Sequence, residues 1–585
     1  MLPKNPFNSL YSEMIDSNQT FLSLFDESHI LKKNDEGEAF ITEEMFNKTV
    51  FFSSALGGGK SSTFHFFSSG VLETIAQSKE EYLDYYVLLE QLNVIVRGKN
   101  RLLGVNISLA RNYEIIDDIY ENGKRTQALF ALLNVRVLKE ALKSILVFNR
   151  ANNDALSLIT FADVPEELTG VFQRDWTGKD YYEWACSEEN LICEELNDLG
   201  DFKAIHFIHN YLSVIQLFEA SNIRYDGNPF VEKVLFMFDD VHRLTLHQKK
   251  ELRESLFVVR ARVGVWLAQR TYGLGDEEVL GLDGTYGRDY LTRRFEDYYH
   301  RSVKTDKSFQ KIADRRAKAT QEINVASFQS CIAESIDWER DKVSRKKLEK
   351  AYDDLEHFLN AYLLPDEITF LKSRGSTLID LTVTLRTAKI FIDRKLSHQQ
   401  LLIDAFFLAP SKEELLKSLE DNSLRSIALY YLCTENDLPF YYGIQKLCSL
   451  AFNNVYQFLS FSGAVFERRL SYRYRAKRNS TIVVSAAEQD SIIHSVAKNK
   501  WEELSVIFAN AERVQSFLRN IASIGLATRD VGAASYSGGT YTGIGIKEKY
   551  FSELMKENSE IRTTLSQCVS NNLFLSGQKP LVMTS

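Results

Sequence analysis

Proline and cysteine are both scarce in this sequence of 585 residues. The 8 prolines argue against long flexible linkers and favour a largely helical chain. The six cysteines form no CxxC pair, and no histidine stands at metal-ligand spacing from Cys186 or Cys193. We therefore expect buried thiols in a reducing compartment, without disulfides or a zinc site.

The sequence also lacks an uninterrupted apolar run long enough to span a membrane. Its most apolar helical stretch, residues 128–148, contains Arg136, Lys139, Glu140 and Lys143. The N-terminal residues do not show the basic-then-apolar order of an export signal. Both features predict a cytoplasmic protein without a membrane segment.

An excess of positive charge is missing as well. The net charge is −9 and the pI is about 5.8, so any nucleic-acid contact requires a local basic patch. Hydrophobic residues make up 44% and charged residues 25%, which is typical of a globular protein with a substantial core. The length predicts two to four domains.

Short apolar runs and longer amphipathic segments alternate in the first 300 residues. The runs rich in β-branched and aromatic side chains predict buried strands, and alternation with helices predicts a parallel sheet covered on both faces. Beyond about residue 300 the pattern is helical. The expected strands are residues 49–55, 102–110, 234–238, 263–268 and 290–295.

These patterns give a domain plan for an α/β P-loop nucleotide-binding core followed by helical regions. The core carries a long helical insertion at about 111–230, and the last region is helix-rich with a winged-helix arrangement as one option. Within that region, the glycine- and serine-rich residues 532–545 are expected to form a loop or a hairpin wing. The planned domains are a helical N-terminal extension (1–45), the core (46–300), a helical lid or linker (301–395) and the C-terminal region (396–585).

A glycine-rich segment follows the first expected strand and precedes a helix. Residues 54–61, SALGGGKS, fit the phosphate-binding pattern G-x-x-x-x-G-K-[ST] except that Ser54 replaces the first glycine. Glycines allow successive backbone N–H groups to face phosphate oxygens, and the helix N-terminus favours negative charge. In this pattern the lysine reaches the β- and γ-phosphates and the hydroxyl after it binds Mg²⁺. The predicted nucleotide-binding residues are Ser54, Gly57, Gly58, Gly59, Lys60, Ser61 and Ser62.

A second motif supports a nucleotide site. The apolar run VLFMF ends in Asp239 and Asp240, which places two carboxylates at a strand tip. A carboxylate at that place can hold Mg²⁺, so we predict Asp239 and Ser61 as metal ligands. Asp240 is predicted to polarise the attacking water. Many hydrolytic P-loop proteins carry a glutamate at this position. Aspartate is one methylene shorter and reaches the water less well, so slow hydrolysis and a nucleotide-gated switch are options.

The segments after the acids make the chain similar to the AAA+ and STAND group of P-loop ATPases. More broadly, it resembles bacterial AAA-type ATPases described as origin-recognition-complex-like, some of which occur in phage-defence loci. The resemblance covers about 400 residues and is carried by five short segments. They are NPF (5–7), the loop (54–61), VLFMFDDVHRL (234–244), GRDY (287–290) and FNNVYQFLSFSG (452–463).

This resemblance implies roles for further residues. It implies that Gln269, at the tip of the strand after the acids, contacts the γ-phosphate or the water. It implies an arginine that reaches the nucleotide of a neighbouring subunit, for which Arg288 is the first choice, ahead of Arg293 and Arg294. A lid helix could supply another arginine, Arg315 or Arg316. The 179 positions between Lys60 and Asp239 exceed those of a compact core and require the insertion.

A basic stretch lies in the C-terminal region. Residues 467–478 contain six cations interleaved with Tyr472 and Tyr474, and no acid follows before Glu488. Such a stretch can follow phosphates of a nucleic acid, or it can contact an acidic protein surface. The cations are Arg468, Arg469, Arg473, Arg475, Lys477 and Arg478.

Two functional hypotheses follow from the sequence. The first is an Mg²⁺- and ATP-binding ATPase, with GTP as an alternative nucleotide, that acts as an oligomeric switch or motor on DNA or is triggered by it, for example in phage defence. The second is an ATP-dependent signalling scaffold that assembles and controls a separate effector protein. The sequence shows no nuclease or protease motif of its own.

Overall fold

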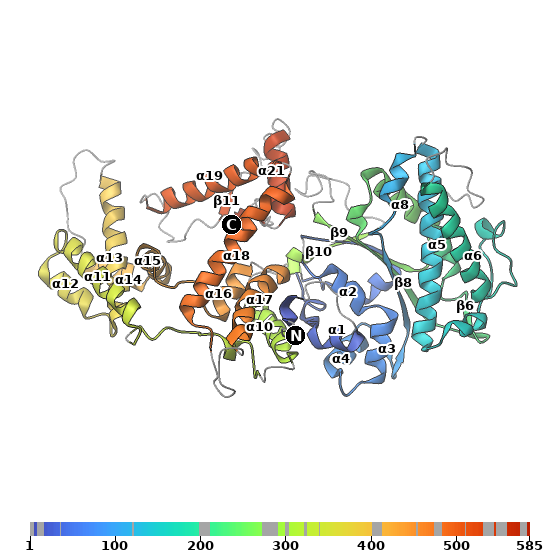
Figure 1. The fold of residues 1–585 in the computed structure, drawn as a ribbon, viewed down its shortest axis with the longest axis horizontal. Helices are drawn as coiled ribbons and strands as arrows, with labels where there is room; N and C mark the ends of the chain where they lie inside the picture. The colour runs from blue at the N-terminus through green and yellow to red at the C-terminus, as the bar shows by residue number, and fades with distance from the viewer. Residues whose placement is uncertain are drawn as a thin grey trace.

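The computed structural model has an α/β half (residues 17–298) and a helical half (residues 303–584), which lie at opposite ends of an elongated molecule (Figure 1). The structure describes residues 5–8, 17–34, 37–55, 57–119, 122–197, 211–271, 290–298, 303–320, 325–338, 340–399, 412–451, 454–472, 483–508, 510–530, 543–545, 559–571, 573 and 582–584.

A five-stranded parallel sheet organises the α/β half. The order of the strands is β10-β1-β9-β8-β4, so β9 separates β1 from β8. All five strands expected from the sequence are confirmed. The strands are β1 (Thr49–Ser54), β4 (Leu102–Ser108), β8 (Lys233–Asp239), β9 (Gly264–Arg270) and β10 (Leu291–Arg294).

Both faces of the sheet are covered, which explains why β4, β8 and β9 are largely apolar, whereas the edge strand β10 has the sequence LTRR. Alternate side chains enter two separate hydrophobic cores. Leu267 of β9 packs in the core that includes α5 to α8, whereas Trp266 packs in the core that includes α1 to α4. The covering helices are α1 (Asn18–Leu24), α2 (Lys60–Phe66), α3 (Ser69–Gln77), α4 (Leu83–Gln91), α5 (Asn122–Asn149), α6 (Gly178–Asn197), α7 (Val214–Leu217) and α8 (Leu246–Val259).

The expected insertion at 111–230 is only partly helical. Its long helices α5 and α6 pack side by side at the outer edge of the α/β half (Figure 1). The same insertion also contains a small antiparallel sheet with the strand order β5-β6-β7. These strands are β5 (Ile159–Phe161), β6 (Ile223–Tyr225) and β7 (Asn228–Pro229), and a two-stranded ribbon elsewhere pairs β2 (Ile95–Val96) with β3 (Lys99–Asn100).

The helical half contains three hydrophobic clusters. Phe7 and α10 share one cluster with α16, α17 and the first part of α18. Helices α11 to α15 form a second cluster, and the end of α18 packs with α19 and α21 in a third. The helices are α10 (Val303–Lys318), α11 (Lys342–Asn360), α12 (Pro365–Lys372), α13 (Leu378–Gln399), α14 (Lys412–Glu420), α15 (Asn422–Glu435), α16 (Ile444–Ala451), α17 (Val455–Tyr472), α18 (Ala486–Ile507), α19 (Ala511–Asp530) and α21 (Ser559–Ser570).

This grouping differs from the domain plan expected from the sequence. The planned boundary at 395–396 falls inside α13, within a single hydrophobic cluster, and α10 packs with helices that follow it by more than 100 residues. Hydrophobic periodicity marks which face of each helix is buried, but it does not identify the helix that covers it.

A short antiparallel pair lies near the end of the chain. Strand β11 (Gly543–Gly545) pairs with β12 (Val582–Thr584). Residues 532–542 of the expected loop or wing lie outside the described residues.

Short 3-10 helices connect several of these elements. Two of them, η3 and η10, contribute to the candidate site described below. The short helices are η1 (Pro6–Asn8), η3 (Glu27–His29), η4 (Glu43–Asn47), η5 (Glu114–Asp118), η6 (Asn153–Leu158), η7 (Glu166–Leu168), η8 (Val241–Arg243), η10 (Phe295–Tyr298) and η11 (Gln329–Cys331).

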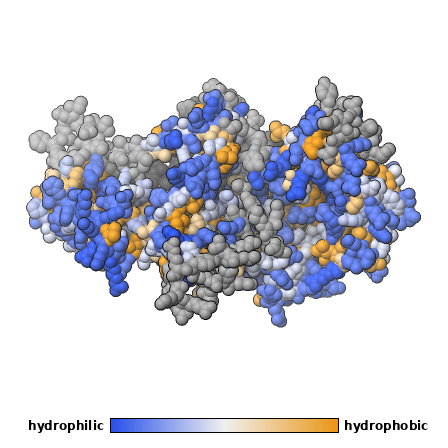
Figure 2. Space-filling model, in the orientation of Figure 1, coloured by the Kyte–Doolittle hydropathy of each residue, from blue (hydrophilic) through white to orange (hydrophobic). Residues whose placement is uncertain are grey.

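Surface and cysteine features complete the description. Among the described residues, every helix is too short or too polar to cross a membrane. The six cysteines are free thiols, four of them buried. On the face drawn in Figure 2, hydrophobic side chains form separate patches among hydrophilic ones.

Candidate functional site

The glycine loop (residues 54–61) joins β1 to α2 at the carboxyl edge of the sheet. Gly57 and Gly59 have φ angles of 78° and 99°, a region in which side chains other than glycine are strained. Gly59 is the N-cap of α2 in a left-handed conformation, so α2 begins at Lys60. Ser61 and Ser62 follow in the first turn of the same helix.

Lys60 is folded into the glycine loop and is almost fully buried. Its Nζ donates hydrogen bonds to Ser54 O at 2.9 Å, Ser54 Oγ at 2.5 Å and Ala55 O at 3.3 Å. Burial lowers the pKa of Lys60 to about 8, although the carboxylates of Glu296 and Asp239 act in the opposite direction. A buried ammonium at this position can bind an anion that enters the loop.

Two glycines of the loop make close approaches that explain their identity. A Cβ on Gly58 would lie 2.3 Å from Ser54 Oγ, so the space is taken by the serine side chain. A Cβ on Gly57 would lie 2.0 Å from the Cβ of Tyr456, at the start of α17. The helical half therefore packs directly on the glycine loop.

Asp239 lies at the tip of β8 and faces α2. It is buried, and it lines one cavity together with Ser61. Burial raises the pKa of Asp239, and the Ser61 hydroxyl opposes that shift. The two predicted metal ligands thus lie at the same cavity.

Asp240 has a left-handed backbone with φ 60° and ψ 29°. Its N–H donates to Asp239 Oδ1 at 2.8 Å, and its Oδ1 lies 3.7 Å from His242 Nδ1. Burial lowers the pKa of His242 to about 3, helped by the charges of Arg270 and Lys60. The neutral His242 ring therefore lies beside the Asp240 carboxylate.

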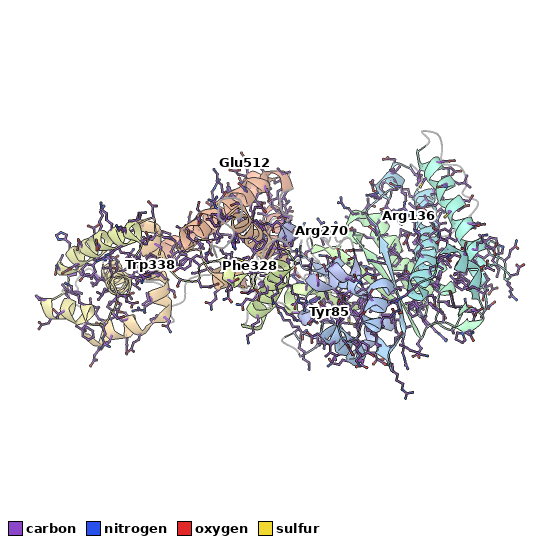
Figure 3. All side chains as sticks on the ribbon, turned by 60° about the horizontal axis from the view of Figure 1, so that its bottom comes forward. Tyr85, Arg136, Arg270, Phe328, Trp338 and Glu512 are labelled. Carbon is purple, nitrogen blue, oxygen red and sulfur yellow. The ribbon has the colours of Figure 1, made fainter. Side chains whose placement is uncertain are left out.

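Gln269 and Arg270 end β9, between the loop strand and the acid strand. Arg270 pairs in register with Ser54 and follows Trp266 and Ala268 by even steps, so it faces the α2 side with Ser54 and Asp239. Its charge acts on Lys60 and His242. Gln269 is buried and lies two residues after Leu267, so its side chain leaves the strand on the face opposite to that of Arg270. Figure 3 labels Arg270.

A polar cavity of about 790 Å³ begins at Ser61 and Asp239 and extends toward α5 and α6. Asn106 lines it, and the Asn106 Oδ1 atom is buried without a hydrogen-bond partner among the described residues. At the far end, Glu189 holds Arg136 and Lys139 in ion pairs of 2.8 and 2.5 Å. Arg136 is labelled on α5 in Figure 3.

A buried histidine contacts the first turn of α2 behind the glycine loop, and no sequence pattern predicts it. His29 Nε2 lies 2.9 Å from Thr63 Oγ1, whose hydroxyl is 2.9 Å from Gly59 O. His29 Nδ1 lies 3.0 Å from Asp26 O. Burial lowers the pKa of His29 to about 4, so the ring is neutral and fixes the first turn of α2.

The arginines predicted for nucleotide contact have different positions. Arg315 donates to Tyr85 Oη at 2.7 Å and pairs with Glu27, and Arg316 donates to Pro6 O at 2.7 Å. Both therefore hold α10 to the N-terminal segments. Arg293 is buried at 3.4 Å from Glu38, and Arg294 is half-buried at the end of β10. Arg288 lies outside the described residues.

The basic stretch is described only up to residue 472. Arg468 lies 3.5 Å from Glu488, so part of its charge is compensated within the protein. Arg469 follows it at the end of α17. The other four cations, Arg473, Arg475, Lys477 and Arg478, lie outside the described residues.

The donor set at the sheet edge suits a hard cation. The Ser61 hydroxyl and the Asp239 carboxylate are oxygen ligands of the kind that Mg²⁺ uses when a bound phosphate and waters complete its shell. Within the described part of the chain, no group of three or more His, Cys, Asp or Glu side chains could hold a metal by itself. This arrangement fits a metal that arrives with a phosphate ligand.

Comparisons with known proteins do not extend this picture. No protein-family model matches the sequence, and neither a curated protein nor a solved structure is significantly similar to it.

Proposed function

We propose that this protein is a P-loop ATPase of AAA type that binds Mg-ATP and acts as an oligomeric, nucleotide-gated switch. The observation that carries the proposal is that Ser61 and Asp239 line one cavity beside the buried Lys60 ammonium. Sequence patterns can place a lysine, a hydroxyl and a carboxylate on two elements, the start of α2 and the tip of β8, but a shared site requires these side chains to meet.

The glycine loop supplies the phosphate-binding groups in this proposal. The backbone N–H groups of residues 57–61 face the phosphates, and the N-terminus of α2 adds its dipole. Lys60 leaves its internal acceptors and binds the β- and γ-phosphates. The Ser54 hydroxyl occupies the space where a Cβ of residue 58 would lie. Because residue 58 is glycine, the loop accommodates a serine at its first position.

Ser61 and Asp239 would hold Mg²⁺. When bound, Mg²⁺ neutralises the charge that develops on the transferred phosphoryl group. The Asp240 N–H donates to Asp239 Oδ1 and keeps the carboxylate in place.

Asp240 and Arg270 act on hydrolysis in this proposal. Asp240 accepts a hydrogen bond from the attacking water. The His242 ring beside it is neutral, so it does not offset the negative charge of the Asp240 carboxylate. Arg270 stabilises negative charge on the γ-phosphate, since it shares the face of Ser54 and Asp239. The short Asp240 side chain favours slow turnover, which suits a switch more than a motor.

The oligomer and its trigger belong to the same proposal. Arg288 remains the first choice for an arginine that acts on the nucleotide of a neighbouring subunit. DNA is the proposed trigger, bound by the basic stretch from Arg468 onward. The antiparallel β11–β12 pair near the end of the chain supports a winged-helix arrangement, which would present this stretch.

Replacing Lys60 tests the nucleotide site. Lys60→Ala should weaken Mg-ATP binding by about 100-fold or more, since it removes a desolvated charge that faces the phosphates. Lys48→Ala is the matched control, because Lys48 is half-exposed and pairs with Glu44 at 2.7 Å. The measurement is isothermal titration calorimetry with Mg-ATP and Mg-GTP. Equal affinity in the folded Lys60→Ala and Lys48→Ala proteins would reject the assignment.

A second measurement separates a DNA-dependent switch from a signalling scaffold. ATP turnover is measured with and without duplex DNA, and mass photometry follows assembly under the same conditions. Stimulated turnover supports the switch. Nucleotide-dependent assembly with negligible turnover, unchanged by DNA, supports the scaffold that controls a separate effector.

A further inference from the structure

The ligand-free glycine loop satisfies its own key groups. Three acceptors surround the Lys60 ammonium, and all belong to residues 54 and 55. An ammonium has three N–H donors, so this set uses all of them. A phosphate that binds Lys60 must therefore displace bonds that already exist.

Ser54 contributes the shortest of these bonds. Its Oγ lies 2.5 Å from Lys60 Nζ and 2.9 Å from Ala55 O, so the hydroxyl donates to the carbonyl and accepts from the ammonium. Glycine is usual at this position of phosphate loops and has no such oxygen. The side chain fits because Gly58 leaves room for it.

Glu296 contributes an internal negative charge. It lies in η10, directly after β10, and its Oε1 accepts a hydrogen bond from Ala55 N at 2.7 Å. Its Oε2 is buried without a hydrogen-bond partner among the described residues. Of the charged groups that act on Lys60, Glu296 has the largest effect, ahead of Asp239. The Glu296 carboxylate thus already supplies a hydrogen-bond acceptor and negative charge to the loop, which a bound phosphate would also supply.

We propose that Ser54 and Glu296 form a latch that holds Lys60 inside the empty loop and thereby lowers the affinity for nucleotides whose phosphates need Lys60. Ser54 is the direct acceptor, and Glu296 is the charge that holds the start of the loop through Ala55. Both are positioning residues, because they act through Lys60 and the loop backbone. This inference rests on the proposed nucleotide site and adds what sets its affinity.

The latch predicts an unusual direction of change, since removing polar groups from a binding loop should strengthen binding. Ser54→Ala removes the hydroxyl and keeps the Cβ. A hydrogen bond to a charged group is worth about 1.5 kcal/mol or more, so affinity for ATP and ADP should rise about tenfold. Glu296→Gln keeps an acceptor for Ala55 N and removes the charge. It should also raise affinity, more for ATP than for ADP, because ATP carries the larger negative charge.

The test measures dissociation constants for Mg-ATP, Mg-ADP and AMP in the full-length protein. Ser53→Ala is the control for Ser54→Ala, since Ser53 is the preceding residue of β1 and faces the other side of the sheet. Asp297→Asn is the control for Glu296→Gln, with the same change of charge one residue away. AMP has no phosphate that reaches Lys60, so its affinity should not change.

A second readout does not depend on nucleotide. Acetylation of Lys60 at one fixed pH, followed by peptide mass spectrometry, reports how tightly the ammonium is held. It should be faster in Ser54→Ala and Glu296→Gln than in the parent and the two controls.

The outcomes separate the latch from the nucleotide site itself. A parent that binds ATP while Ser54→Ala and Glu296→Gln bind it equally or more weakly would overturn the latch and leave the site intact. Equal gains for AMP would also overturn it, because such gains do not pass through Lys60. If neither the parent nor any variant binds nucleotide, the proposed function fails and the effect of the latch on affinity fails with it, even where Lys60 becomes more reactive in both variants.

Discussion

The two halves of the molecule are held together in different ways. In the α/β half, one sheet separates two large cores, and the strands β1, β4, β8 and β9 each contribute side chains to both. In the helical half, the described residues form three smaller clusters, of which one joins helices distant in sequence, such as α10 with α17, and the other two are built from helices that follow one another closely. Figure 3 labels Phe328 and Trp338 in the helical half and Arg136 and Arg270 in the α/β half.

This difference suggests a division of roles. Parallel strands bring their carboxyl ends to one edge with fixed spacing, so functional side chains there are positioned by backbone register. Separate helical clusters can shift relative to one another with little loss of buried area. Chemistry is therefore expected at the sheet edge, and the helical half is expected to respond to it.

The largest expected effect concerns the two residues at the tip of β9. Arg270→Ala should lower ATP turnover by about 10²- to 10³-fold, because it removes a charge preorganised on the α2 face. Gln269→Ala should have a smaller effect on turnover, since Gln269 starts from the opposite face. Steady-state ATPase assays of both purified variants decide the order. A larger loss with Gln269→Ala would show that the alternation of side chains along β9 does not determine which residue acts on hydrolysis.

The sequence predicted the α/β half well for a physical reason. A buried parallel strand must be apolar on both faces, and the runs before Ser54 and Asp239 show this without reference to distant residues. Strand parity could also have identified Arg270, because it follows Trp266 and Ala268 at even spacing. The resemblance implies Gln269 instead, and the assay of both variants decides between the two residues.

The sequence predicted the helical half and the insertion less well. The strands β5 to β7 have two or three residues each, too few to show a period. The contact of His29 with Thr63 depends on how η3 folds over α2, and no local pattern encodes it. The approach of Tyr456 to Gly57 spans almost 400 residues and follows from packing alone.

The next prediction tests the independence of the halves. Leu371→Ala, in the cluster of α11 to α15, should destabilise that cluster by about 3 kcal/mol through an internal cavity. The Kd for Mg-ATP should stay within about twofold of the parent. Leu267→Ala in β9 is the matched comparison and should lower both stability and ATP affinity. Chemical denaturation and calorimetry measure the two quantities, and an equal loss of affinity in both variants would contradict the division.

A smaller effect is expected from pH, and it belongs to the α/β half. The pKa of His29 is about 4 in the folded protein and about 6.5 when unfolded. Between these values the unfolded chain binds more protons, so the free energy of unfolding falls as pH falls below 6.5 and levels off below 4. The expected loss is about 1.4 kcal/mol at pH 5.5 relative to neutral pH.

Urea denaturation at pH 7.5 and 5.5 measures this loss. The comparison is with His29→Gln, in which the titrating ring is absent and the difference between the two pH values should shrink by that amount. An unchanged pH dependence in His29→Gln would assign the effect to another group. Other buried groups also titrate in this range, and the variant isolates the share of His29.

The smallest expected effect lies where the two halves meet. The Cβ and Cα of Tyr456 make the close approach to Gly57, whereas its ring lies under Lys500 Nζ at 5.1 Å. Tyr456→Ala keeps the backbone and Cβ contact, so the affinity for ATP should change by only about twofold. Gly57→Ala is the stronger counterpart, since a Cβ there would push α17 away and strain a residue with φ 78°.

If α17 transmits the state of the loop, nucleotide should protect α17 amides from hydrogen exchange in the parent and in Tyr456→Ala, and Gly57→Ala should abolish that protection. Equal protection in all three proteins would mean that the helical half does not respond to the loop through this contact.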